Sequence, residues 1–227
     1  MPLARKLRIA AGMLVLAAIA LVIGWWYWIH WAPSRDTYPL QGITVSRAQG
    51  AVDWGSIRAQ GIDFAYIRAI SGDGRDPAFA RNWAEARRAG LRYGAELAYD
   101  PCRPADEQAT LFITTVPRDN AMLPPAVRLD RTRHCAGGQP GRDHIVSELN
   151  TLINLVEAHS GKTALLRVSQ GFEAAYAVST SINRTLWLER NFFTPDYAAR
   201  PWVMWTANSE RRIDGAAGAV EWNVVAP

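Results

Sequence analysis

The chain opens with a long apolar run. From Ile9 to Ile29 no Asp, Glu, Lys or Arg occurs. About 21 helical residues, rising 1.5 Å each, cross the roughly 30 Å hydrocarbon core of a bilayer. We therefore predict a transmembrane helix over residues 9–31, preceded by a short basic tail over residues 1–8.

The charges around this run predict its orientation. Arg5, Lys6 and Arg8 precede it, and no Lys or Arg follows until Arg35. By the positive-inside rule the N-terminus is cytoplasmic and the remainder lies outside the cytoplasmic membrane. The alternative is a cleaved signal peptide, which has a shorter apolar run and small residues at its cleavage site. Aromatic residues, which prefer the headgroup layer, crowd the outer end instead: Trp25, Trp26, Tyr27, Trp28 and Trp31.

Beyond the apolar run, residues 32–41 hold two prolines among polar residues and predict a linker. Segments with the period of a strand then alternate with segments with the period of a helix. Strands are predicted over residues 43–46, 64–70, 91–97, 125–130, 163–169, 185–190, 201–207 and 219–225, and helices over 53–61, 76–90, 105–116, 144–160 and 171–179.

Alternation over about eight strands and five helices implies parallel strands with helices outside them. We predict a modified β/α barrel of the TIM type over residues 42–227, with an irregular end because the last third has few helices. A doubly wound open sheet is the alternative, although no GxGxxG or GxxxxGK[ST] motif supports a nucleotide site. Asp53 and Asp76 are the expected N-caps of the first two helices of this domain, with Pro77 opening the second.

Composition narrows the function classes. A chain of 227 residues, 49% hydrophobic and 20% charged, forms one domain or at most two small ones and is not a disordered protein. The net charge of +4 falls to +1 without the three cations of the basic tail, so no basic face for nucleic acid is expected. His134, His144 and His159 are scattered and form no HExxH motif, so we expect no metal site and no cofactor.

The two cysteines, Cys102 and Cys135, both lie in the part predicted to be outside the cytoplasm. Thiols tend to be oxidised there, so we predict a disulfide between them, with two separate free thiols as the alternative.

Several segments, in order, carry a family resemblance: GITVSRAQGAVDW (42–54), GIDFAYIRAISG (61–72), DPAFARNWAEARRAGLRYGAE (76–96), LPPAVRLD (123–130), PWVMW (201–205) and IDGAAGAVEWN (213–223). With these segments the chain resembles glycoside hydrolase family 25, the lysozymes that cut peptidoglycan glycan strands on a modified β/α barrel. The resemblance covers about residues 42–225 and implies an active site at the C-terminal ends of the strands.

The chain departs from the family pattern at these strand ends. Thr44 stands where the family's G-I-D-V-S segment has Asp, and Ser71 stands where A-T-E-G has Glu. The D-x-E at the end of the fourth strand, whose Glu resembles a general acid, is here Arg128, Leu129, Asp130. The final V-D segment ends in Glu221. The catalytic motifs therefore look degraded.

Glycoside hydrolysis needs a protonated carboxyl and usually a second, ionised one. Asp130 is a candidate acid, but it is shorter than Glu, and Arg128 on the same strand face would lower its pKa. The alternative is a structural ion pair of Asp130 with Arg128 or Arg68. Glu96 and Glu221 are the other candidate catalytic residues, as a relocated pair with Asp130. Alternatively, Glu96 only neutralises Arg128 or Arg68.

Aromatic side chains on or beside strand ends are candidates for stacking on sugars, and core packing is the alternative for each. A disulfide from Cys102 to Cys135 would tie the loops after the third and fourth strands and stabilise the fold by about 3–4 kcal/mol. The candidate substrate-binding residues are Tyr66, Tyr99, Arg128, Trp202 and Trp205, with Trp222 nearby.

Three functional hypotheses follow. The first is a membrane-anchored lysozyme-like domain that binds peptidoglycan glycan with lost or much reduced muramidase activity. The second is an active N-acetylmuramidase with a rearranged carboxylate pair. The third is an envelope scaffold with a protein partner and no role for the pocket.

Overall fold

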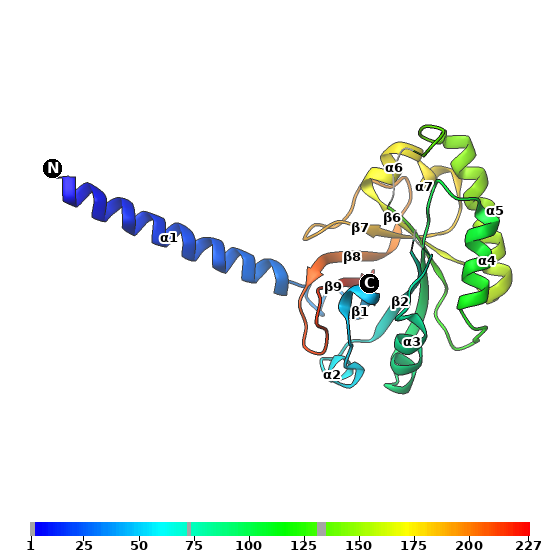
Figure 1. Ribbon diagram of the computed structural model, residues 1–227, viewed down its shortest axis with the longest axis horizontal. Helices are drawn as coiled ribbons and strands as arrows, with labels where there is room; N and C mark the ends of the chain where they lie inside the picture. Colours follow the sequence, from blue (N-terminus) through cyan, green and yellow to red (C-terminus); the bar gives the residue numbers. More distant parts are fainter. Residues whose placement is uncertain (1–2, 72–73, 131–134) are drawn as a thin grey trace.

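The computed structural model describes residues 3–71, 74–130 and 135–227; Gly72 of the AISG segment and His134 therefore lie outside the described residues. Within these ranges eight strands close into a barrel (Figure 1). They are β1 (Gln41–Val45), β2 (Phe64–Ser71), β4 (Arg92–Ala98), β5 (Ala126–Leu129), β6 (Leu165–Ser169), β7 (Thr185–Glu189), β8 (Trp202–Arg211) and β9 (Val220–Val225). A two-residue strand, β3 (Gly74–Arg75), pairs with the end of β2. The predicted barrel is confirmed.

The barrel closes through a strand that runs against its neighbours. Strands β1, β2, β4, β5, β6, β7 and β8 are joined by parallel pairings, whereas β9 lies antiparallel to both β1 and β8. No helix stands between β8 and β9, and a short connection between neighbouring strands forces them to run in opposite directions. This is the irregular end that the scarcity of helices predicted.

Helices cover the outside of much of the barrel (Figure 1). They are α2 (Trp54–Ala59), α3 (Phe79–Arg88), α4 (Ala105–Thr115), α5 (Arg142–Ser160), α6 (Gln170–Tyr176) and α7 (Val178–Ser181), with a 3-10 turn, η1 (Arg47–Gln49), after β1. The last predicted helix is thus two short ones. They separate at Ala177, whose left-handed φ of 47° interrupts the helical backbone.

One of the two expected helix caps is confirmed and the other is wrong. The Asp53 carboxylate accepts hydrogen bonds from the amides of Gly55 and Ser56, as an N-cap does. Helix α3 instead begins at Phe79 and has no side-chain cap. Asp76 accepts hydrogen bonds from the amides of Ala78 and Arg47, so it holds the turn before the helix and ties it to the end of β1.

Apolar residues pack on both sides of the barrel wall. A large core fills the space between the strands and the covering helices. A smaller cluster fills the interior toward the N-terminal ends of the parallel strands, and it contains Phe64, Tyr66, Ala126, Leu165, Trp187 and Met204. The interior toward the opposite ends is left for polar groups.

Helix α1 (Leu3–His30) projects away from the barrel (Figure 1). Residues Ile9–His30 are long and apolar enough to cross a membrane, judged by length and composition. The residues expected to form a linker lie against the barrel. Arg35 forms an ion pair of 2.9 Å with Asp63, and the Gln41 side-chain amide donates hydrogen bonds to the carbonyls of Pro33 and Tyr38.

Candidate functional site

Charged side chains fill the barrel interior above the apolar cluster. Arg68, Arg128 and Arg167 come from β2, β5 and β6. Side chains alternate between the two faces of a strand, so one position in two faces inward. Parallel register sets Arg128 beside Arg167 on neighbouring strands. The acids are Glu96 of β4, Asp130 after β5, Glu189 of β7 and Glu221 of β9. We call these seven residues the barrel charge cluster.

Arg167 is the centre of this cluster, with only 1% of its side chain exposed. Its guanidinium lies 2.7 Å from Glu96, 2.5 Å from Glu189 and 2.6 Å from Glu221. The same group stacks over the ring of Trp187, 4.6 Å from its centroid, which joins the charged layer to the apolar layer beneath. Burial disfavours a cation, but the three carboxylates outweigh it and hold the pKa of Arg167 above its usual range.

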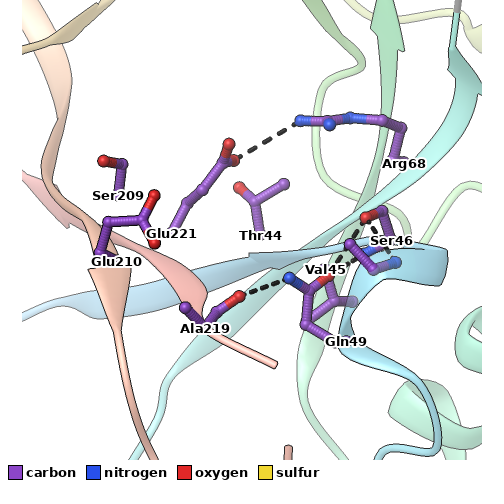
Figure 2. A pocket seen from close by; sticks show the side chains of 10 residues that line it. Thr44, Val45, Ser46, Gln49, Arg68, Ser209, Glu210, Ala219 and Glu221 are labelled. Atoms are coloured by element: carbon purple, nitrogen blue, oxygen red, sulfur yellow. Dashed lines mark hydrogen bonds and ion pairs between the residues drawn. The ribbon is translucent and has the colours of Figure 1, made fainter. Parts of the chain in front are cut away.

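Each interior glutamate also contacts a second arginine. Arg68 donates to Glu96, with its Nη2 2.6 Å from Oε1, and lies 3.6 Å from Glu221 (Figure 2). Arg128 lies 2.6 Å from Glu221 and 3.3 Å from Glu189. These carboxylates are therefore bridged by guanidinium groups on more than one side.

This arrangement keeps Glu96 and Glu221 ionised. Burial by itself would raise the pKa of Glu96, but Arg68 and Arg167 outweigh burial and lower it. Burial likewise opposes the charge of Glu221, and its arginine neighbours, led by Arg167, lower its pKa well below the usual range. Neither glutamate is held as a protonated acid.

Asp130 lies at the edge of the cluster and is 29% exposed. One of its oxygens is 3.1 Å from Nε of Arg128, which is the ion pair given above as the structural alternative. Its other oxygen is buried and makes no hydrogen bond with the described residues. In this respect Asp130 differs from Glu96 and Glu221, whose side-chain oxygens all pair with guanidinium groups.

Thr44 takes part in a chain of polar contacts that crosses the interior. Its hydroxyl accepts a hydrogen bond of 2.9 Å from the Asn223 amide and lies 3.4 Å from Arg167. Asn223 accepts in turn from Thr206, and Thr206 accepts from the indole of Trp187. Strand register places Thr44 beside Glu221, so a carboxylate at this position would be next to one already present.

A cavity of about 320 Å³ opens over this layer (Figure 2). Arg68 and Glu221 form its floor, and Ser209 and Glu210 at the end of β8 form one wall. The opposite wall comes from the end of β1 and from Gln49, whose side-chain amide donates to the Ala219 carbonyl. The cavity lies at the C-terminal ends of the parallel strands, where barrel enzymes bind their substrates.

The aromatic candidates do not line this cavity. Tyr66 and Tyr99 are 2% and 0% exposed, and Tyr66 donates to the Pro124 carbonyl within the lower apolar layer. Trp205 is 2% exposed on the outer face of β8, where it packs against Trp31 and Trp202. These rings take the alternative role given for them, core packing. Trp222 is also buried, with its indole donating to Gln41.

The predicted disulfide is confirmed. Cys102 and Cys135 are bonded, with their Cα atoms 5.3 Å apart and 33 positions apart in sequence. A second cavity of about 420 Å³ lies beside this bond, bordered by His144 and Glu148 of α5. Within the described ranges, no group of three His, Cys, Asp or Glu residues is arranged to hold a metal ion.

Sequence reasoning missed two members of the cluster, Arg167 and Glu189. Both had a readable signal. Arg167 is the one charge in the apolar strand segment TALLRVS, and Glu189 ends the apolar segment TLWLE. A charge inside a strand that is otherwise apolar needs a buried partner, so each should have been assigned to the barrel interior.

Comparison with known proteins gives the family. The model of "Glycosyl hydrolases family 25" matches residues 43–216, more than half of the chain. The protein YegX of Escherichia coli (strain K12) is 28% identical over 200 residues, covering 83% of this chain and 70% of YegX. Lysozyme M1 of Streptomyces globisporus is 26% identical over 206 residues, covering 83% of this chain and 68% of the lysozyme.

A solved structure agrees with this assignment. The family 25 glycosyl hydrolase from Bacillus anthracis superimposes with a TM-score of 0.77 at 26% identity, covering 86% of this chain and 92% of that one. The residues matched by the family model include strands β2 to β8 and every member of the barrel charge cluster except Glu221. The chain therefore belongs to glycosyl hydrolase family 25.

Proposed function

We propose that this protein is a membrane-anchored family 25 domain that faces peptidoglycan and binds its glycan, with muramidase activity lost or much reduced. The observation that carries the proposal is the set of arginines between the interior carboxylates. Glu96 and Glu221, two of the three candidate catalytic residues, each contact two or more guanidinium groups within 4 Å. A glycosidase acid must deliver a proton, and these contacts favour the form that has none.

The charge of the cluster also opposes the chemistry in a second way. The transition state of glycoside hydrolysis resembles an oxocarbenium ion and carries positive charge on the sugar. Arg68 lines the cavity beside Glu221, so a cation would stand close to a sugar bound there. Repulsion between the two would raise the barrier that the missing carboxylates normally lower.

Glycan binding is supported by the open cavity and by the family. The cavity is lined by hydroxyl, amide, carboxylate and guanidinium groups, which are suited to hydrogen bonding with sugar hydroxyls. Relatives in this family include a lysozyme, so peptidoglycan is the proposed ligand. We therefore propose that the sugar contacts the cavity lining and Arg128. The buried tyrosines and Trp205 are less suited to this role.

The proposed location follows from helix α1. Its apolar span Ile9–His30 has the length of a transmembrane helix, and Arg5, Lys6 and Arg8 favour a cytoplasmic N-terminus. The barrel would then lie outside the cytoplasmic membrane, on a single-pass anchor. A disulfide between Cys102 and Cys135 is typical of such an oxidising compartment. Retention of the chain in membranes after alkaline carbonate extraction tests the anchor.

One observation favours a second candidate, an active muramidase with Asp130 as its acid. Asp130 has a buried oxygen without a hydrogen-bond partner in the described part of the chain, at the position that matches the family's D-x-E. Among the three candidate catalytic residues, Asp130 is the one with a carboxyl oxygen that the described residues leave available to carry a proton toward a glycosidic oxygen. In this case Asp130→Asn abolishes any measured activity.

A single incubation separates the candidates. The full chain in detergent micelles is mixed with purified peptidoglycan, pelleted, and the supernatant is analysed for released reducing ends, with an active family 25 lysozyme as positive control. Our proposal predicts pelleting with the wall without release. Release that disappears in Asp130→Asn would establish the second candidate. Absence of both pelleting and release would leave the envelope scaffold with a protein partner.

A further inference from the structure

The outer end of α1 is held by the barrel through its backbone. The amide of Arg212 donates a hydrogen bond of 2.7 Å to the Ile29 carbonyl. The side-chain amide of Asn208 donates to the carbonyls of Trp28 and Trp31, at 2.7 and 3.1 Å. Both donors lie at the end of β8 or just after it. The helix therefore meets the barrel at a fixed place, without a flexible spacer between them.

The segment between β7 and β8 lies beside the same helix end. Phe192 packs its ring against Trp28 and Trp31, with centroids 4.7 and 5.0 Å away. Its φ of 67° is left-handed, a conformation that costs a non-glycine residue about 1–2 kcal/mol. In Figure 1 this segment reaches out from the barrel on the side where α1 joins it. This strained turn therefore lies against the outer end of α1, where its packing on Trp28 and Trp31 offsets the strain.

The next residue, Phe193, is left exposed. Phe193 is 67% exposed, although it is a large apolar side chain, and among the barrel residues with exposed apolar side chains it is the most exposed. The guanidinium of Arg190 lies 5.9 Å from the centroid of this ring, and Arg190 is itself paired with Asp196. An apolar ring left in water beside a helix end calls for a covering partner.

We propose that Phe193 inserts into the lipid interface beside α1 and gives the barrel a second contact with the membrane. The partner is lipid because Phe193 directly follows Phe192, which touches Trp28, and Trp25, Trp26, Tyr27 and Trp28 are all exposed on α1. Aromatic rings in such a belt lie at headgroup depth. Adjacent Cα atoms are about 3.8 Å apart, so Phe193 lies at nearly the same depth as Phe192. This inference rests on the proposed anchor.

The contact brings the cavity close to the membrane. Ser209 and Glu210 line it, and they stand between Asn208 and Arg212, the two residues that hold the helix end. At about 3.3 Å per strand residue, that wall of the cavity lies roughly 10 Å or less from the end of α1. The glycan that this cavity reaches is then the glycan next to the bilayer.

The two native cysteines are bonded to each other, so a cysteine introduced by mutation is the one free thiol and can be labelled specifically. The full chain carrying Phe193→Cys is labelled with the fluorophore NBD and reconstituted into phosphatidylcholine and phosphatidylglycerol vesicles with or without nitroxide-headgroup lipid. Leu155→Cys, a 38% exposed position on α5 at the far side of the barrel from α1, is the matched control. Thr194→Cys gives a second reporter in the same segment.

We expect NBD at position 193 to shift its emission to the blue and to be quenched by nitroxide lipid several times more strongly than NBD at position 155. Equal, weak quenching at 193, 194 and 155 in chains that resist carbonate extraction would overturn this inference and leave the anchor standing. Extraction of the chains by carbonate would overturn both.

Discussion

Substitution of Arg167 by Met tests whether the barrel charge cluster holds the domain together. Met keeps much of the length of the side chain and removes the charge. Three carboxylates within 2.7 Å of Arg167 then lose their shared partner. Breaking a buried ion pair from one side costs about 3–5 kcal/mol. We expect the lower part of that range, because Arg68 and Arg128 still face the same acids.

Thermal unfolding of the full chain in detergent measures this loss. In a domain of 150–250 residues, each kcal/mol lowers Tm by about 2–4 °C, so a loss of about 3 kcal/mol corresponds to roughly 6–12 °C at pH 7.5. Arg184→Met is the matched control, since Arg184 pairs with Glu157 on the outer surface at 2.7 Å with both side chains partly exposed. We expect about 1 kcal/mol or less there.

The pH dependence of the Tm difference shows whether the stability lost in Arg167→Met comes from the interior carboxylates. Glu96 and Glu221 have lower pKa values in the folded protein than the ordinary 4.5, so their contribution is present above pH 4.5 and is lost as the pH falls. In Arg167→Met, buried Glu96 loses one of the guanidinium groups that lower its pKa. The pKa of Glu96 therefore rises, and the carboxylate takes up a proton at a higher pH. The Tm difference between wild type and variant should therefore be larger at pH 7.5 than at pH 4.5. An equal difference at both values, or a more stable variant at pH 7.5, would refute this reasoning.

Three further predictions concern other parts of the chain. Cys102→Ser should lower stability by about 3–4 kcal/mol through loss of the bond to Cys135, and a reductant should then lower the Tm of the wild type but not of the variant. Burial lowers the pKa of Arg211 to about 10, and two of its nitrogens have no hydrogen-bond partner in the described residues, although its guanidinium stacks 3.8 Å over the ring of Trp222. At any pH below about 10 the folded protein therefore loses stability by carrying this charge. Arg211→Met should accordingly raise stability by about 1 kcal/mol at pH 7, after allowance for partial exposure, and a lower Tm would contradict this. Asn208→Ala removes two hydrogen bonds to the end of α1 and should speed tryptic cleavage after Arg35 in proteoliposomes, whereas an unchanged rate would mean that Asn208 does not hold that segment.

Most of the fold could be predicted because hydrophobic period and turn residues are local signals. All eight barrel strands lie where the apolar segments predicted them, within a few residues. The direction of β9 could not be predicted from the residues of the strand itself, because they do not show whether its neighbours run parallel or antiparallel to it. The start of α3 was missed because Asp76 bonds to Arg47, a contact between residues 29 positions apart.

The candidate site was predicted only in part, and the reason lies in register. Glu96, Asp130 and Glu221 were identified as carboxylates near strand ends, and ion pairing of Glu96 with arginine was the stated alternative to catalysis. Their meeting with Arg167 depends on how eight strands are staggered around the barrel, which no local pattern contains. Trp205 was placed among sugar-binding rings because it lies beside a strand end, and nearness to a strand end does not show which face of β8 a side chain takes.

The barrel charge cluster also bears on how such a domain can change over evolutionary time. Its cations and anions are interdependent, so replacing one member leaves its partners with fewer opposing charges in a largely buried interior. A proton donor at Glu96 or Glu221 would require loss of at least two arginines, and we expect each intermediate to be less stable than the present chain. Acquiring such a donor by stepwise mutation would therefore first lower stability. Selection on this scaffold would then favour new ligands more readily than a proton donor at either glutamate.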